Sequence, residues 1–337
     1  MAISAASTAR NRPGGGPRTV TVGILTYQRP KSLARTLASL APIAMDQPGR
    51  TWRIHDILVI DNDAQPTARA IVEELVTSGF PLAVRYRHEP TPGLAAARNR
   101  ALDEAEADVL VFIDDDETAE AGWPDGLVTT MDATGAALVG GPVRTTFAAA
   151  PPRWIIDGGF FDRPEPPDRT PQTWLRSGNL ALDLAQVTAH SLRFDEQFGL
   201  TGGEDTDFSL RASKLGLGLQ WSSTAVVTEI VGPDRTTIGW LTRRERRSTA
   251  NWVRAELAQH GNSPQRRLLI ASRGLARLGQ GSIMTGAGLL QRRRSRVVRG
   301  LVVASRGIGS LHGLLGGRST AYGLPSGAAP TGIESSE

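Results

Sequence analysis

The sequence predicts an α/β protein with a doubly wound, mostly parallel sheet and a basic helical extension at its C-terminal end. Three observations carry this prediction. Strand-like and helix-like segments alternate four times, with short connections, up to residue 113. Polar residues gather where the apolar strands end, which is the edge at which such sheets bind ligands. Beyond residue 261 acidic residues almost disappear, while arginines recur beside leucines.

The first strand is expected at residues 20–26, which are mostly β-branched. A turn that ends at Pro30 then leads into a helix over residues 31–40, with leucines at 33, 37 and 40 on one face. The same pattern continues through strands at 57–60, 83–88 and 109–113 and helices at 67–77 and 94–107.

The second half of the chain is less regular. We expect a strand at 137–143 and an apolar segment at 180–182. Between them, residues 149–171 form a proline-rich loop whose aromatic side chains favour a lid. A further helix is expected to begin near Phe208, directly after an acidic cluster that ends at Asp207.

The aspartate triplet Asp114, Asp115 and Asp116 follows the buried strand 109–113 without a break. Together with Glu117 these like charges repel one another, and a divalent cation would neutralise them. Oxygen ligands without histidine or cysteine favour Mg²⁺ or Mn²⁺, which commonly bind through one or two carboxylates and substrate phosphates. The triplet therefore predicts a phosphorylated or nucleotide-linked ligand; an acidic surface turn is the alternative.

Composition excludes several classes of protein. The 337 residues contain no cysteine, which removes disulfides and thiolate chemistry. Residues 1–17 have no apolar core of a signal peptide, and no stretch has about 18 apolar residues, so we expect neither export nor a spanning helix. Residues 1–18 are expected to be a disordered leader and residues 318–337 a flexible tail.

Charge is distributed unevenly along the chain. The overall net charge is +4, yet residues 262–337 hold eleven arginines and two acidic residues. The spacing of leucines and arginines over 262–315 predicts amphipathic helices that lie on an anionic membrane surface. Helices docked on the rest of the protein with a solvated arginine face remain an alternative. Nucleic acid is the least favoured partner because few aromatic residues are present for base stacking.

Five blocks of sequence resemble the family 2 glycosyltransferases of the GT-A fold, and they occur in that family's order. The blocks are residues 21–30 (TVGILTYQRP), 59–62 (VIDN), 93–99 (GLAAARN), 114–116 (DDD) and 203–205 (GED). The resemblance covers about residues 19–256 and is greatest to succinoglycan-type exopolysaccharide glucosyltransferases. Thr249 stands where the family's arginine-rich segment is expected to have glycine.

The resemblance implies a GT-A domain over 19–256, an arginine-rich extension over 257–317, and a role for particular residues. Thr26, Tyr27 and Asp61 would bind the nucleoside and Arg98 the pyrophosphate. Asp114 would contact the ribose and, with Asp116, the metal, and Asp115 belongs to the same nucleotide-sugar site. Asn179 would contact the donor sugar or the acceptor. The general base would be Asp205, with Glu204 as the second choice.

The function implied is inverting, metal-dependent transfer of a sugar from a nucleotide-sugar donor, UDP-glucose or similar, to a lipid-linked oligosaccharide. The enzyme would act in exopolysaccharide or cell-surface glycan synthesis, in the cytoplasm and peripherally on the inner face of the cell membrane. Two alternatives stay open: a catalytically inactive membrane-associated scaffold, and a sugar nucleotidyltransferase. A dinucleotide-dependent oxidoreductase is excluded because its glycine-rich loop is absent after the first strand, where the sequence reads TYQRP.

Overall fold

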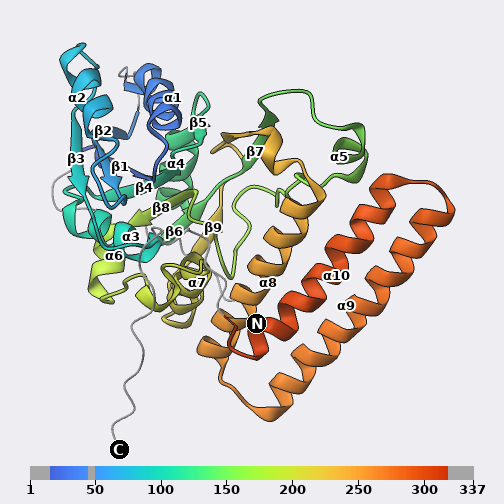
Figure 1. The fold of residues 1–337 in the computed structure, drawn as a ribbon. Coiled ribbons are helices and arrows are strands. Elements are labelled where there is room, and N and C mark those ends of the chain that lie inside the picture. The colour runs from blue at the N-terminus through green and yellow to red at the C-terminus, as the bar shows by residue number, and fades with distance from the viewer. Residues whose placement is uncertain (1–15, 45–49, 318–337) are drawn as a thin grey trace, which may run out of the picture.

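The computed structural model describes residues 16–44 and 50–317. In this part of the chain a seven-stranded sheet lies between two layers of helices, and a long helix followed by a helical hairpin stands to one side (Figure 1). Most of the predicted leader, residues 1–15, and the whole predicted tail, residues 318–337, lie outside the described residues.

The large sheet has the strand order β3-β2-β1-β4-β8-β6-β9. Its first four strands are parallel, and β8 is antiparallel to both of its neighbours. The strands are β1 (Arg18–Thr26), β2 (Trp52–Asp61), β3 (Val84–His88), β4 (Val109–Asp114), β6 (Leu138–Gly140), β8 (Asn179–Asp183) and β9 (Leu219–Trp221). This arrangement confirms the predicted mostly parallel, doubly wound sheet.

Alternate residues of each strand point to opposite faces, so the sheet builds two apolar cores. Val111 and Ile113 pack into one core, and Leu110 and Phe112 pack into the other. Each such side chain contributes about 1.5–3 kcal/mol when buried. The first core is covered by α1 (Pro30–Leu40), α2 (Arg69–Thr77) and α4 (Trp123–Thr134). The second is covered by α3 (Leu94–Glu104), α6 (Leu184–Ala189) and α7 (Glu204–Lys214).

A separate three-stranded sheet has the order β5-β10-β7, and the sequence pattern did not predict it. Its strands are β5 (Glu117–Ala119), β7 (Val143–Phe147) and β10 (Val227–Val231). The single strand expected at 137–143 is wrong, because the chain leaves β6 at Gly140 and enters β7 at Val143. The break lies at Gly141, where a Cβ atom would stand 2.3 Å from the carbonyl oxygen of Ala225.

Other element boundaries also differ from expectation. The helix expected to start near Phe208 begins at Glu204, so the acidic cluster forms its first turn. The proline-rich loop contains a short helix, α5 (Arg153–Gly158). Three short 3₁₀ turns complete the elements: η1 (Ala41–Ala44), η2 (Glu196–Phe198) and η3 (Pro233–Arg235).

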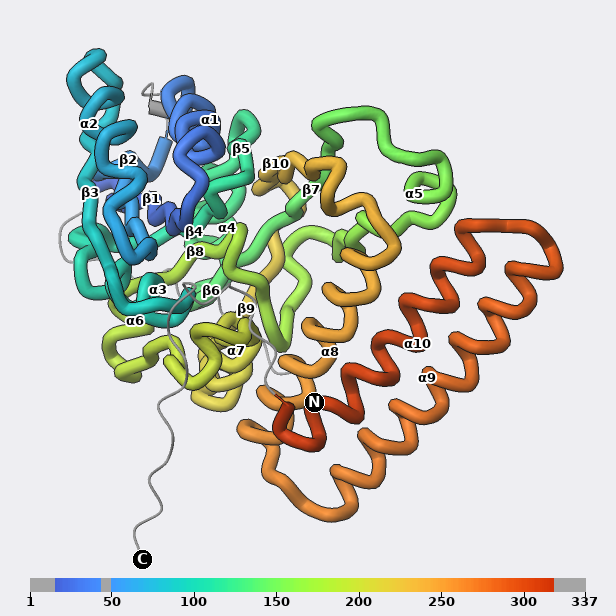
Figure 2. The backbone as a smooth tube through the Cα atoms, viewed as in Figure 1, coloured from blue at the N-terminus to red at the C-terminus, as the bar shows by residue number. Residues whose placement is uncertain are grey.

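The last part of the described chain consists of α8 (Ile238–His260), α9 (Pro264–Leu290) and α10 (Arg294–Leu314). The helices α9 and α10 form a hairpin, and α10 packs along α8 (Figure 2). Glycine permits this close packing, because a Cβ atom on Gly309 would lie 2.4 Å from the carbonyl oxygen of Arg246. The predicted basic helical extension is confirmed. Since α8 runs past residue 256, the proposed domain boundary there stays a prediction.

The length and polarity of the helices bear on membrane insertion. Across residues 16–44 and 50–317, every helix is too short or too polar to span a bilayer.

Candidate active site

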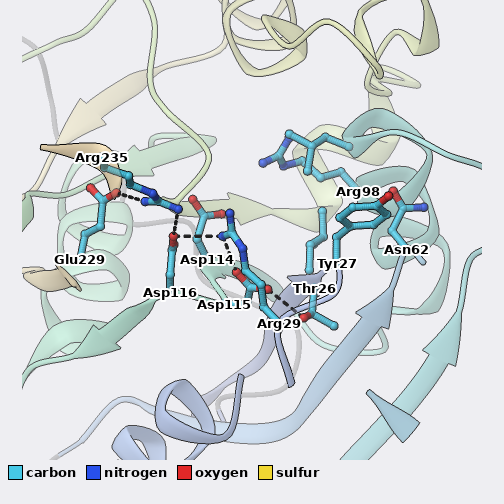
Figure 3. Close-up of a pocket in the computed structure, with 12 residues that line it drawn as sticks. Thr26, Tyr27, Arg29, Asn62, Arg98, Asp114, Asp115, Asp116, Glu229 and Arg235 are labelled. Atoms are coloured by element: carbon cyan, nitrogen blue, oxygen red, sulfur yellow. Dashed lines mark hydrogen bonds and ion pairs between the residues drawn. The ribbon is translucent and has the colours of Figure 1, made fainter. Parts of the chain in front are cut away.

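A cavity of about 410 Å³ lies at the carboxyl ends of β1 and β4. Leu25 and Asp114 are partners in the pairing of these strands, so the residues after them converge. Figure 3 shows the side chains that surround the cavity. They are Leu25, Thr26, Tyr27, Arg29, Asn62, Leu94, Arg98, Asp114, Asp115, Asp116, Glu229 and Arg235. The fold therefore gathers most of the predicted donor-site residues in one place.

Asp116 stands at the centre of an ion-pair network in this cavity. Its carboxylate pairs with Arg29 at 3.0 Å and with Arg235 at 2.9 Å. Arg235 also pairs with Glu229 on β10, at 3.0 Å. Two guanidinium groups thus neutralise Asp116 and hold it at the cavity surface (Figure 3).

Asp115 has a different environment from Asp116. Its carboxylate is buried and accepts hydrogen bonds from the hydroxyl of Thr26 at 2.8 Å and from Arg29 at 3.2 Å. Asp115 therefore fixes the loop between β1 and α1, and the Thr26 hydroxyl donates its hydrogen to this contact.

Asp114 is half-buried at the end of β4, close to the acidic side chains of Asp116 and Glu229. Burial, followed by the charge of Asp116, raises its pKa to about 7. The neighbouring Glu117, which accepts from the Asp114 N–H at 3.2 Å, also has a raised pKa because it is buried beside Asp114. A Cβ atom at Gly178 would lie 2.7 Å from Asp114 Oδ2, so glycine is required there for the carboxylate to sit against the backbone.

These carboxylates fit a hard divalent cation. In the described part of the chain no three Asp, Glu or His side chains converge to enclose a metal. Two carboxylates suffice, however, when substrate phosphates complete the coordination, as they commonly do for Mg²⁺. Asp114 and Asp116 both line the cavity, and burial leaves Asp114 poorly neutralised. The donor set is therefore suitable for the predicted cation.

Asp61 lies outside the group of side chains that line this cavity. It is fully buried at the end of β2, where it accepts from the backbone N–H groups of Asp63 and Ala68 and from the Tyr86 hydroxyl at 2.8 Å. Burial and this carboxylate raise the pKa of Tyr86. Asp61 thus braces the β2–α2 connection, while the predicted nucleoside residue Tyr27 does line the cavity.

Arg98, on the second turn of α3, forms a buried ion pair with Glu204 at the start of α7. Burial raises the pKa of Glu204 to about 7, even though Arg98 opposes this change. One carboxylate oxygen, Glu204 Oε2, is buried with no hydrogen-bond partner in the structure. Glu204 therefore holds Arg98 at the cavity wall. Glu204 is buried, whereas the next residue, Asp205, is half-buried.

Asp205 faces a second cavity of about 400 Å³, which adjoins the first. The two cavities share four lining residues, Leu94, Arg98, Asp114 and Glu229. Asp205 Oδ1 accepts from the backbone N–H of Thr206 at 2.7 Å. The predicted metal carboxylates and the predicted base thus line one continuous space, with Arg98 between them.

Asn179 lies fully buried at the start of β8. Its amide group donates to the carbonyl oxygens of Pro142 at 3.0 Å and Ala225 at 2.7 Å, and its side-chain oxygen accepts from the Trp123 indole at 2.8 Å. Both N–H donors are therefore used to join β8 to its surroundings. The predicted sugar contact by Asn179 stays a prediction.

Sequence reasoning did not assign a role to Arg235, Glu229 or Arg29. Arg29 belongs to the block 21–30 that resembles the family, whereas Glu229 lies only within the wider resemblance over about residues 19–256. Arg235 gave no signal, because it lies 119 residues from Asp116 and the intervening small sheet was not predicted.

Comparison with known proteins identifies glycosyltransferases as similar proteins. Residues 21–182 match the family described as "Glycosyl transferase family 2". The chain is 39% identical over 236 residues to "Succinoglycan biosynthesis protein ExoM" of Rhizobium meliloti (strain 1021), and the match covers 68% of this chain and 72% of that protein.

Solved structures share the fold at low identity. The mannosyltransferase PcManGT from Pyrobaculum calidifontis, solved with GDP-Man and Mn²⁺, aligns with a TM-score of 0.55 and 17% identity. That alignment covers 89% of this chain and 88% of PcManGT. GalNAc-T7, solved with UDP, GalNAc and Mn²⁺, aligns with a TM-score of 0.52 and 15% identity. The alignment covers 72% of this chain and 48% of GalNAc-T7. These similarities support the GT-A fold.

Proposed function

The chain belongs to the family 2 glycosyltransferases, and from this premise we propose that it is an inverting, metal-dependent enzyme of exopolysaccharide or cell-surface glycan synthesis. It transfers one sugar from a nucleotide-sugar donor, UDP-glucose or similar, to a lipid-linked oligosaccharide on the cytoplasmic face of the membrane. The relative named as a succinoglycan biosynthesis protein supports the polysaccharide setting.

One observation carries this proposal: the cavity lined by Asp114 and Asp116 adjoins the cavity lined by Asp205, and Asp114 lies in the wall of both. Asp114 and Asp116 line the first cavity, and Asp205 lines the second. A donor diphosphate bound at the first pair and an acceptor hydroxyl beside Asp205 would occupy neighbouring cavities. This proximity supports the proposal of a direct displacement between donor and acceptor.

In that reaction the acceptor hydroxyl oxygen forms a bond to the anomeric carbon, and the bond from that carbon to the β-phosphate oxygen breaks. Asp205 accepts the hydroxyl proton, and the nucleoside diphosphate leaves with the bonding electrons. A single displacement inverts the anomeric centre, so an α-linked donor gives a β-glycoside. Arg98, on the wall between the cavities, offers positive charge to the leaving diphosphate.

A divalent cation, Mg²⁺ or Mn²⁺, would be held by Asp116 and Asp114 and would supply charge stabilisation to the diphosphate. The Mn²⁺ in the solved relatives supports this assignment. Tyr27 and Thr26 line the same cavity and are proposed to contact the nucleoside. The nucleoside contact by Asp61 stays a prediction, since its oxygens accept hydrogen bonds from the backbone N–H of Ala68 and from the Tyr86 hydroxyl.

The first test is a transfer assay with the purified full chain, Mn²⁺ and radiolabelled UDP-glucose, UDP-galactose or GDP-mannose. The acceptor is an organic extract of bacterial membranes that contains lipid-linked saccharides. We expect label from one donor to enter the organic phase as a β-linked sugar. Label that stays water-soluble with every donor would contradict lipid-linked transfer and would favour a scaffold.

The α9–α10 hairpin supports attachment to a membrane. Its large apolar side chains include several that are strongly exposed, with Leu290 89% and Ile283 74% accessible. At the tip, Arg292, Arg293 and Arg296 are exposed beside Leu290. Exposed leucines with arginines at their margin suit an interface of anionic lipid, where each basic residue contributes about 1 kcal/mol.

Replacing Leu290 by Asp should therefore reduce cosedimentation with phosphatidylglycerol vesicles about tenfold, because one buried leucine contributes about 1.5–3 kcal/mol. Val76→Asp is the matched control, since Val76 is a 50% exposed apolar residue on α2, far from the hairpin (Figure 1). Equal loss in both variants, or no vesicle binding by the unaltered chain at low salt, would show that the hairpin is not the membrane surface.

A further inference from the structure

Arg176, Arg244 and Arg247 are three of the five arginines that line the second cavity together with Asp205. Arg244 and Arg247 lie one turn apart on α8, and Arg176 lies on the segment that leads into β8. The same cavity wall includes Ser248, Asn251 and Trp252, which continue the α8 face at helical spacing. The cavity that holds the predicted base is thus strongly basic on the α8 side.

These arginines lack the partners that other arginines of the site have. Arg163, on the same wall, pairs with Glu229 and donates to the carbonyl oxygen of Val143 at 3.1 Å. Across residues 16–44 and 50–317, by contrast, no hydrogen bond or ion pair joins the side chain of Arg176, Arg244 or Arg247 to another residue. Their guanidinium donors remain available to a ligand.

Aromatic rings hold two of these guanidinium groups in position. Arg244 lies over the ring of Trp240 at 5.2 Å from its centroid and over Phe161 at 5.8 Å. Arg176 lies over Trp174 at 5.6 Å. Such contacts fix the planar group while leaving its N–H donors free to bind an anion.

The surroundings make the positive charge costly without a ligand. Burial, followed by the charge of Arg163, lowers the pKa of both Arg176 and Arg244. Arg176 and Arg244 also repel each other. Like charges that are crowded together and short of partners are stabilised when an anion binds between them.

The position of this cluster distinguishes it from the donor site. None of the three arginines lines the first cavity, which contains Asp116, whereas Asp114 lies in the wall of both cavities. They line the cavity of Asp205, which the proposed function gives to the acceptor. On its opposite side, α8 packs against α10 of the exposed hairpin, where Gly309 meets the backbone of Arg246. The cluster therefore lies between the base and the proposed membrane surface.

We propose that Arg176, Arg244 and Arg247 form an anion subsite that binds the phosphate or diphosphate group of the acceptor's lipid carrier. This inference rests on the proposed function and names the part of the acceptor that the enzyme recognises. Because the arginines and Asp205 line one cavity, the saccharide between the carrier phosphate and the attacking hydroxyl is short.

The test is titration calorimetry of the full chain with farnesyl diphosphate in EDTA, which suppresses the metal-dependent donor site. Farnesol and inorganic pyrophosphate are titrated in parallel. We expect farnesyl diphosphate to bind, and Arg244→Gln or Arg247→Gln to raise its Kd about 10- to 100-fold, as expected for loss of a charge-assisted hydrogen bond. Arg243→Gln, an exposed neighbour on α8, should leave the Kd unchanged.

Three other outcomes would overturn the proposal. Farnesol that binds as tightly as farnesyl diphosphate would show recognition of the chain and not of the phosphate. Loss of binding in Asp116→Asn but not in the arginine variants would place the anion in the donor site, and no binding at all would remove the subsite. Retained metal-dependent nucleotide binding in the arginine variants shows that they fold and separates failure here from failure of the proposed function.

Discussion

Replacing Asp205 by Asn is expected to lower kcat for sugar transfer about 10²- to 10⁴-fold, because the acceptor hydroxyl loses its general base. Asn keeps the size and the side-chain oxygen that accepts from the Thr206 N–H. Affinity for the donor nucleotide should be unchanged, since Asp205 does not line the first cavity. The measurement is a steady-state transfer assay together with calorimetry of the nucleotide.

Glu204→Gln is the matched control for this result. Glu204 is adjacent in sequence but buried, and it holds Arg98 in an ion pair. Its loss should weaken diphosphate binding and stability more than it affects proton transfer. A larger fall in kcat for Glu204→Gln than for Asp205→Asn would make Glu204 the base, which was the second choice on sequence.

Replacing Asp116 by Asn should abolish the metal-dependent part of nucleotide binding, a loss of more than about 100-fold in affinity with Mn²⁺. Loss of a group that only supports a metal ligand already costs about 10- to 100-fold, so loss of a ligand costs more. The variant also removes the charge that pairs with Arg29 and Arg235. Calorimetry with and without EDTA measures the effect.

Asp115→Asn is the control within the triplet, since the Asp115 carboxylate is directed to Thr26 and Arg29. It should lose at most about tenfold in affinity, which is roughly the contribution of one ordinary hydrogen bond, because the Asn side-chain oxygen can still accept from Thr26. An equal loss in the two variants would mean that the triplet acts as a general acidic surface and that Asp116 has no special role.

The parallel half of the fold could be predicted because its signals are local. Leu33, Leu37 and Leu40 lie on one helical face and are all fully buried. The strand that ends at Asp114 was equally clear, because five apolar residues stop at a charge. The small sheet was not predicted, because its strands pair residues far apart in the sequence, such as Val227 and Val143. Such pairing leaves no local pattern in the sequence.

In the site, likewise, the residue types could be predicted from the sequence, but their contacts could not. The carboxylates could be predicted because repeated aspartates at a strand end repel one another unless a cation neutralises them. The engagement of Asp61 by Tyr86, and of Asn179 by Trp123, depends on neighbours brought in by folding. The hairpin packing was not predicted, although glycines recur every seven residues at 274, 281 and 288, because the spacing of leucine and arginine does not define which helices pack together.

The central claim is that Asp114 and Asp116 form a cation-dependent nucleotide site. Titration calorimetry of the full chain with UDP, GDP and dTDP, each with Mn²⁺ and then with EDTA, tests it most directly. We expect one of these nucleotides, most of all UDP, to bind with Mn²⁺ and to lose most of its affinity in EDTA. Binding that is the same in EDTA, or no binding of any of the three, would contradict it.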